Sequence, residues 1–229
     1  MTPKQAIRAA SAVAAIAVLA LASTLLSSRR LHATSEDNGD DEPRIRRGFE
    51  IAPVPLNLEG KNRALVGLGS YIVNAVADCN GCHSAGPATE FARGGNPYMN
   101  QPTQINTATY LGGGRDFGPY PGPGPFPHII SRNLTPDKTG RPEGGRSFKE
   151  FVQIIRHGTD LDHLHPTCTG APDGTCLPAP FDGDLLQVMP WPIHRNMTNH
   201  DLRAIYEYLS AIPCIAGPPA PSVLHNDCQ

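Results

Sequence analysis

The sequence predicts a mainly α-helical domain that is interrupted by long irregular loops. Three segments carry apolar residues at helical spacing, and the strict alternation expected of a sheet strand is missing. Gly and Pro make up roughly a fifth of the 229 residues, a share that favours loops. Such a chain needs more than its own side chains to fill a core, so we expect a buried cofactor.

The first predicted helix begins near Gly60 and leads directly into Cys79. Gly67 and Gly69 weaken this helix, because glycine costs more backbone entropy than alanine, but they would let another helix approach closely. Its apolar positions recur at helical spacing: Leu65, Leu68, Ile72, Ala75 and Val76.

Two further helices have clear boundary signals. Ser147 and Glu150 form a Ser-x-x-Glu capping box, and Gly158 ends that helix. Thr198 caps the third helix, with Asp201 at the position of the capping-box acid. Both segments also carry an apolar stripe, so each predicts an amphipathic helix.

The chain between Ser84 and Arg132 lacks a helical pattern. Its residues 118–127, GPYPGPGPFP, cannot form a helix or a central strand, because proline has no amide donor and a fixed φ. We expect a surface loop that folds over the cofactor.

The first 26 residues predict export. Lys4 and Arg8 precede an uncharged stretch at 9–26, and residues 20–22 (ALA) offer a small-x-small cleavage site, as in a signal peptide. The stretch is also at the short limit of a membrane span, so an uncleaved anchor stays open. Either reading places the folded part in the periplasm or on the periplasmic face of the cytoplasmic membrane.

The rest of the chain divides into three parts. Residues 27–59 include the acidic segment SEDNGDDEP and predict a flexible linker. Residues 60–213 form the predicted folded domain, and residues 214–229 form a Pro-rich C-terminal tail. The net charge of −2, with no Lys or Arg run longer than a pair, argues against nucleic acid as a partner.

The strongest motif is Cys79-Asn80-Gly81-Cys82-His83, a C-x-x-C-H sequence typical of covalent haem attachment. Two thiols three residues apart can each reach one vinyl group of a porphyrin. The next residue, His83, then lies under the ring, where its imidazole can bind the iron. The sequence therefore predicts one covalently bound haem c.

Two other chemistries use a C-x-x-C pair. A structural zinc site would need a second pair of ligands, and no other C-x-x-C occurs in the chain. A thioredoxin-like dithiol would need a βαβ setting, whereas this motif follows a predicted helix. The adjacent His83 and the export signal favour haem.

The second iron ligand is expected to be a methionine or a histidine. Met197 has a structural explanation, because it precedes the Thr198 cap and can pack on Leu202 as a hydrophobic staple. Met189 has no such explanation, and prolines fix the segment VMPWP around it, whereas Met99 lies in a polar loop. Ligation by a second histidine is the other possibility, with these candidates: His128, His157, His163, His165 and His194.

Several motifs occur in order along residues 60–213: CNGCH at 79–83, NLTPD at 133–137 with Gly140, FVQIIRHG at 151–158, MPW at 189–191 and LRAIYEYL at 202–209. Together they resemble class I c-type cytochromes. The closest resemblance is to a single haem module of the cytochrome c subunits of bacterial alcohol and related dehydrogenases. It implies that Met189 is the distal ligand and that the first and last helices cross near the haem edge. Those subunits carry several modules, whereas this chain has one attachment motif.

Four cysteines remain after haem attachment. In an exported chain an even remainder predicts two disulfides, and four cysteines allow three pairings. We favour Cys168–Cys176 and Cys214–Cys228, because each closes a short local loop. The second would pin the Pro-rich tail back onto the last helix.

These observations predict an electron carrier rather than an enzyme. The expected partners are a donor dehydrogenase and an acceptor cytochrome or oxidase. A membrane is a partner only if the N-terminal segment stays uncleaved. The alternatives are a peroxidase-like haem enzyme, which needs an open iron position, and a gas-binding haem sensor with a labile Met189.

Overall fold

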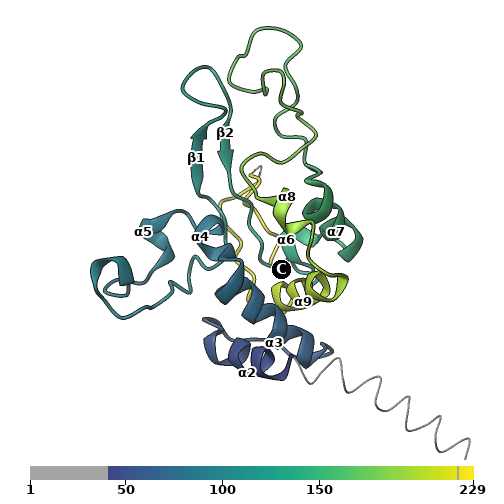
Figure 1. Cartoon of the computed structure of the whole chain (residues 1–229). Helices are drawn as coiled ribbons and strands as arrows, with labels where there is room; N and C mark the ends of the chain where they lie inside the picture. Colours follow the sequence, from purple (N-terminus) through teal and green to yellow (C-terminus); the bar gives the residue numbers. More distant parts are fainter. Residues whose placement is uncertain (1–40, 221) are drawn as a thin grey trace, which may run out of the picture. The chain divides into compact units, whose positions relative to one another are not determined.

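The structure, a computed structural model, describes residues 41–220 and 222–229, and this part of the chain is mainly helical with one two-stranded sheet (Figure 1). The predicted export segment, residues 1–26, lies outside the described residues. Residues Arg44–Gln229 form one compact unit, to which the candidate site belongs. Within the described ranges, no helix has the length and apolar character to cross a membrane.

The helices and strands follow the chain in this order: α2 (Glu42–Ile51), α3 (Arg63–Tyr71), the π-helical turn η1 (Ile72–Val76), α4 (Cys79–His83), α5 (Pro87–Glu90), the 3₁₀ turn η2 (Pro97–Met99), β1 (Asp116–Pro119), β2 (His128–Ile130), α6 (Pro142–Gly145), α7 (Phe148–His157), α8 (Trp191–His194) and α9 (Asn199–Leu209).

Helix α3 lies between two other helices at close range. Gly67 faces α2, where Gly48 packs against its main chain, and Gly69 faces the main chain of Ala204 in α9. A Cβ atom at Gly48 or Gly69 would collide with the opposing backbone, so these crossings require glycine. The predicted close approach of helices at Gly67 and Gly69 is confirmed.

After this crossing, η1 continues α3 along the chain and brings Asn74 into a buried polar cluster. The Asn74 amide donates to the main-chain oxygen of Ser70 and, at 3.2 Å, to the hydroxyl of Tyr208. That hydroxyl lies 2.8 Å from the hydroxyl of Tyr110, and both tyrosines are fully buried. The cluster ties α3, α9 and the loop before β1 together just ahead of the C-x-x-C-H motif.

The predicted linker at residues 27–59 extends too far toward the C-terminus, because residues 42–51 form α2. Ile45 and Val54 are buried in the core, and the amide of Asn57 donates to the main-chain oxygen of Ala211 at 2.8 Å. Charged residues surround the few apolar ones in this segment, so its composition resembles a linker. Its order comes from packing on the glycine face of α3, a tertiary contact.

Both capping boxes form as predicted. In α7 the Ser147 side chain accepts from the amide of Glu150, and the carboxylate of Glu150 accepts from the amide of Ser147. Thr198 and Asp201 make the same reciprocal pair at α9. Gly158 ends α7 in the left-handed conformation, with φ of 68°. These caps fix the ends of two helices that line the site.

The irregular region contains a short antiparallel hairpin that the sequence interpretation does not include. Strands β1 and β2 pair from Asp116 opposite Ile130 to Pro119 opposite His128, and the Pro-rich stretch forms the loop between them. The imidazole of His128 also lies 2.8 Å from the Asp116 carboxylate. With so few residues and a proline at the end of β1, the hairpin leaves almost no alternating pattern in the sequence.

Both predicted disulfides, Cys168–Cys176 and Cys214–Cys228, are present. The second links Cys228 back to Cys214, shortly after the end of α9, and the tail also contacts the turn at residues 133–135. Asn133 donates through its side-chain amide to the main-chain oxygens of Ile215, at 2.8 Å, and Leu224, at 3.0 Å. The tail is therefore an integral part of the folded unit.

Candidate cofactor site

A large cavity lies between α4, α7, α9 and the segment before α8. Figure 1 shows how these elements are arranged. It contains about 1070 Å³ of unfilled space, with its open mouth and the adjoining solvent included. Its walls are mainly apolar and comprise Ala77, Asp78, Cys79, Cys82, His83, Phe117, Ile129, Ser131, Arg132, Leu134, Glu143, Phe151, Ile154, Ile155, Leu186, Gln187, Val188, Met189, Pro190, His194, Met197, Ile205 and Leu209.

Helix α4 presents the two cysteines of the motif on the cavity wall. Asp78, with φ of 47°, turns the chain sharply between η1 and α4. Cys79 and Cys82 then lie three residues apart, which places both on one face of a helix, and both are free thiols. Burial, with the nearby charge of Asp78 as a second cause, raises the pKa of Cys79 to about 12, so this thiol is neutral in the protein.

His83 also lines the cavity, and one of its ring nitrogens already has a partner. Its Nδ1 atom lies 2.8 Å from the main-chain oxygen of Arg132, to which Nδ1–H donates. Burial lowers the pKa of His83, so the ring is neutral and carries its proton on Nδ1. The Nε2 atom therefore keeps its lone pair, as a metal-binding histidine requires.

Met189 lies on the same cavity, in the segment that precedes α8. Trp191 positions this segment: its indole Nε1 donates to the main-chain oxygen of Leu186 at 3.1 Å, and its ring covers Gly158 so closely that a Cβ there would collide. Val188 has φ of 70°, an uncommon value for a β-branched residue. Within the Pro-containing segment VMPWP, Trp191 begins the short helix α8, and Pro190 is its N-cap residue.

Of the other predicted iron-binding residues, some line the cavity and the rest lie elsewhere. Met197 and His194 line the cavity together with Met189, and either methionine is therefore within the site. Met99 is 69% exposed and is not part of the lining. The remaining four candidate histidines are absent from the cavity walls: His128, His157, His163 and His165. The choice of Met189 over Met197 stays a prediction that rests on the resemblance.

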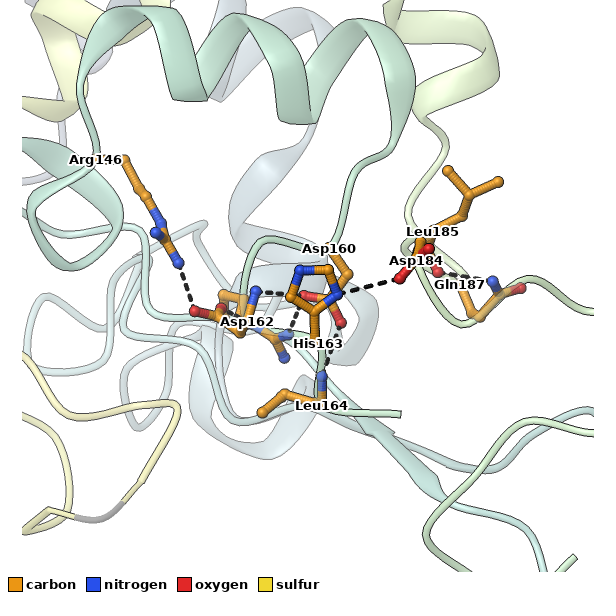
Figure 2. Close-up of polar contacts among 9 residues, drawn as sticks. Arg146, Asp160, Asp162, His163, Leu164, Asp184, Leu185 and Gln187 are labelled. Atoms are coloured by element: carbon orange, nitrogen blue, oxygen red, sulfur yellow. Dashed lines mark hydrogen bonds and ion pairs between the residues drawn. The ribbon is translucent and has the colours of Figure 1, made fainter. Parts of the chain in front are cut away.

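Arg132 is a wall residue that the sequence does not predict, and its side chain is only 13% exposed. Its guanidinium pairs with Asp160 at 3.1 Å and with Asp162 at 3.2 Å. Arg146 also pairs with Asp162 (Figure 2). Asp160 also accepts from the amide of Leu164 at 3.3 Å. This network holds the loop after α7 against the cavity wall, but no local sequence signal distinguishes Arg132 from a surface arginine.

Glu143 is the second wall residue that the sequence interpretation does not include. It lies in α6, a turn in which Glu143 itself has φ of 51° and ψ of 54°, the left-handed region. Burial raises the pKa of its carboxyl to about 7, and nearby Arg146 and Arg132 only partly oppose this effect.

These residues fit a covalently attached haem. Two free thiols and a histidine whose Nδ1 is bonded to the main chain share one helix, in a cavity whose walls are mainly apolar and include a thioether. Covalent attachment by two cysteines and axial ligation by His and Met is the ligand set of c-type cytochromes.

Comparison with known proteins supports a cytochrome. The chain is 30% identical over 149 residues to the gluconate 2-dehydrogenase cytochrome c subunit of Pantoea cypripedii, an alignment that covers 64% of this chain and 23% of the relative. It is 24% identical over 163 residues to the fructose dehydrogenase cytochrome subunit of Gluconobacter japonicus, which covers 71% of this chain and 24% of the relative. No family model and no solved structure matches the chain. The chain therefore spans about a quarter of the length of these two relatives, and its similarity is to cytochrome subunits of dehydrogenases.

Proposed function

We propose that this chain is a monohaem c-type cytochrome that carries single electrons between a dehydrogenase and a downstream acceptor. The observation that carries the proposal is the arrangement of α4, which brings Cys79, Cys82 and His83 to the wall of one apolar cavity. A haem bound there supplies one-electron redox chemistry. The chain attaches, orients and shields it.

Each site residue has a separate task in this proposal. Cys79 and Cys82 hold the haem through thioether bonds, and His83 binds the iron through Nε2 while Nδ1–H donates to the Arg132 main chain. Met189 is the proposed second iron ligand, and a thioether bound there would favour the reduced state and raise the reduction potential of the haem. The apolar walls exclude water, which also disfavours the more highly charged oxidised state.

The partner is proposed from the comparisons. The two relatives are named as cytochrome subunits of gluconate 2-dehydrogenase and fructose dehydrogenase, so we infer a dehydrogenase of sugars or sugar acids as the electron donor. The sequence resemblance to haem modules of alcohol dehydrogenase cytochrome subunits supports the more specific proposal that the donor is an alcohol or related dehydrogenase. The acceptor is a second cytochrome or an oxidase.

The location is proposed as the periplasm or the periplasmic face of the membrane. Residues 1–26 carry the sequence pattern of an export segment. Two disulfides, Cys168–Cys176 and Cys214–Cys228, are compatible with an oxidising compartment.

Carbon monoxide separates the carrier from the two alternatives. We expect the Soret band of the reduced protein to stay unchanged when carbon monoxide is added, because two protein ligands close the iron. A rapid shift of that band would support a gas sensor or a peroxidase-like enzyme instead. As a second arm, the oxidised protein should be reduced by a sugar or sugar-acid dehydrogenase with its substrate, and should show no peroxidase turnover.

A further inference from the structure

Glu143 occupies a boundary between two cavities. One is the apolar cavity described above, and the other is a polar cleft of about 1060 Å³, open solvent included, lined in part by residues of the C-terminal tail. Arg132 and Glu143 are the two described residues that line both. Because the cleft is open to solvent and includes Ser222, His225 and Asn226, it offers a polar route between the carboxyl group and water.

Glu143 and Arg132 differ in how their charges are compensated. Arg132 is held by the carboxylates of Asp160 and Asp162, and Arg146 by that of Asp162 and, at 4.0 Å, that of Glu150. Among the described residues, no hydrogen bond or ion pair reaches the carboxylate of Glu143. Of the two residues shared by the cavities, Glu143 is therefore the one whose charge can change.

The backbone of Glu143 is also unusual. A left-handed conformation is unfavourable for a residue other than glycine, and a side chain that needed only solvent would gain nothing from it. Here the conformation is set by the turn, in which the amide of Arg146 donates to the main-chain oxygen of Pro142 at 2.9 Å. The turn directs a carboxyl group to a cavity wall that is otherwise mainly apolar.

Charged and titratable groups lie around Glu143 on several neighbouring elements. Arg146 follows it after α6, Arg132 follows β2, and Asp160 and Asp162 belong to the loop after α7. The polar cleft adds His225 from the tail, and the apolar cavity adds Asp78, His83 and His194. Desolvation is nevertheless the largest influence on the carboxyl group, and it places the pKa at about 7.

We propose that Glu143 is a redox-linked proton site, which takes up a proton when the haem in the adjoining cavity receives an electron. This inference rests on the proposed function. One electron comes from the donor dehydrogenase and one proton from solvent through the polar cleft, and the proton binds a carboxylate oxygen of Glu143. On oxidation by the acceptor both leave, so the charge of the site stays constant.

The coupling follows from electrostatics at short range in a medium of low polarity. An added electron makes the site more negative, which raises the proton affinity of a nearby carboxylate. By reciprocity, protonation of Glu143 raises the affinity of the site for the electron. The reduction potential therefore falls as the pH rises through the range in which Glu143 ionises.

Redox potentiometry of the holoprotein between about pH 5.5 and 8.5 tests this coupling. We expect the wild-type potential to fall with pH, toward a limit of about 59 mV per pH unit for one proton per electron. Glu143→Gln should abolish most of that slope, and Glu143→Asp should retain it. Glu59→Gln, at an exposed position outside both cavities, is the control and should behave as wild type.

A wild-type slope that persists in Glu143→Gln would overturn the inference, because the haem propionates would then carry the proton. A flat wild-type profile would overturn it as well. If the glutamine variant fails to fold, two measurements on folded proteins test the proton site. The first is proton uptake by the wild-type protein on reduction in weakly buffered solution. The second is the carboxylic acid band in the redox-difference infrared spectra of wild type and Glu143→Asp. Failure of the proposed function would look different, since no covalently bound, redox-active haem would be found.

Discussion

The Nδ1 atom of His83 lies 2.8 Å from the main-chain oxygen of Arg132. The guanidinium of Arg132 pairs with Asp160 and Asp162 in the loop after α7. One arginine thus orients the imidazole with its backbone and anchors a cavity wall with its guanidinium. The wall and the proposed iron ligand are therefore fixed relative to each other.

Met189 and Met197 both line the cavity, so their substitution separates two assignments of the distal ligand. We predict that Met189→Ala abolishes the weak near-infrared-edge band that marks sulfur bonded to ferric haem, and that Met197→Ala retains it. Optical spectra of the two oxidised variants check this. A band that survives in Met189→Ala but vanishes in Met197→Ala would transfer the assignment to Met197.

The crossing of α3 and α9 depends on Gly69. A Cβ at this position would collide with the main chain of Ala204, so Gly69→Ala must separate the helices, at a cost of about 1–3 kcal/mol or more. Denaturant unfolding of the holoprotein measures this loss. Gly170→Ala is the control, because nothing lies within 4 Å of a Cβ there, and we expect a change of less than about 0.5 kcal/mol. Equal stabilities of the two variants would show that the crossing is not tightly packed.

The Cys214–Cys228 disulfide closes a loop with a sequence separation of 14. Replacing both cysteines with serine should lower the free energy of unfolding by about 3 kcal/mol, since the unfolded chain gains freedom. The same change at Cys168 and Cys176, which are 8 residues apart, should cost less, because the loop is shorter. Denaturant unfolding without reductant compares the two. A larger loss of unfolding free energy in the Cys168/Cys176 variant than in the Cys214/Cys228 variant would contradict the stabilising role of the C-terminal tail.

Glu143 also predicts a pH dependence of stability. Burial raises its pKa from the ordinary 4.5 to about 7, so the folded protein favours the protonated carboxyl more than the unfolded chain does. The protonated carboxyl of Glu143 therefore contributes to the free energy of unfolding. This contribution is fully present below about pH 4.5 and is lost as the pH rises through about 7; it amounts to at most about 3 kcal/mol. Relative to Glu143→Gln, wild type should therefore become less stable between about pH 5 and 8 in urea unfolding experiments. A constant difference would show that the carboxyl is solvated.

Local signals predicted the parts of the fold that depend on local chemistry. The capping boxes at Ser147 and Thr198 form because each needs only residues three positions apart. The two short disulfide loops are confirmed for a similar reason: their cysteines are close in sequence. Gly69 predicts the crossing of two helices, because a glycine within a helix is destabilising and is most useful where another backbone packs closely against it.

The features that the sequence interpretation missed depend on distant contacts. Helix α2 has too few apolar residues to be recognised, and it is ordered through Gly48 against α3. Arg132 and Glu143 resemble surface residues in the sequence. Their positions on the cavity wall follow from how the segments after β2 and before α7 meet, which no residue spacing encodes.

The most direct test of haem attachment is the intact mass of the protein, produced with a cytochrome c maturation system and measured under denaturing conditions. We predict one haem per chain that resists acidic organic extraction, and its loss when Cys79 and Cys82 are both replaced by alanine. A chain that carries no haem, or that releases it on extraction while Cys79 and Cys82 remain free thiols, would contradict the central claim.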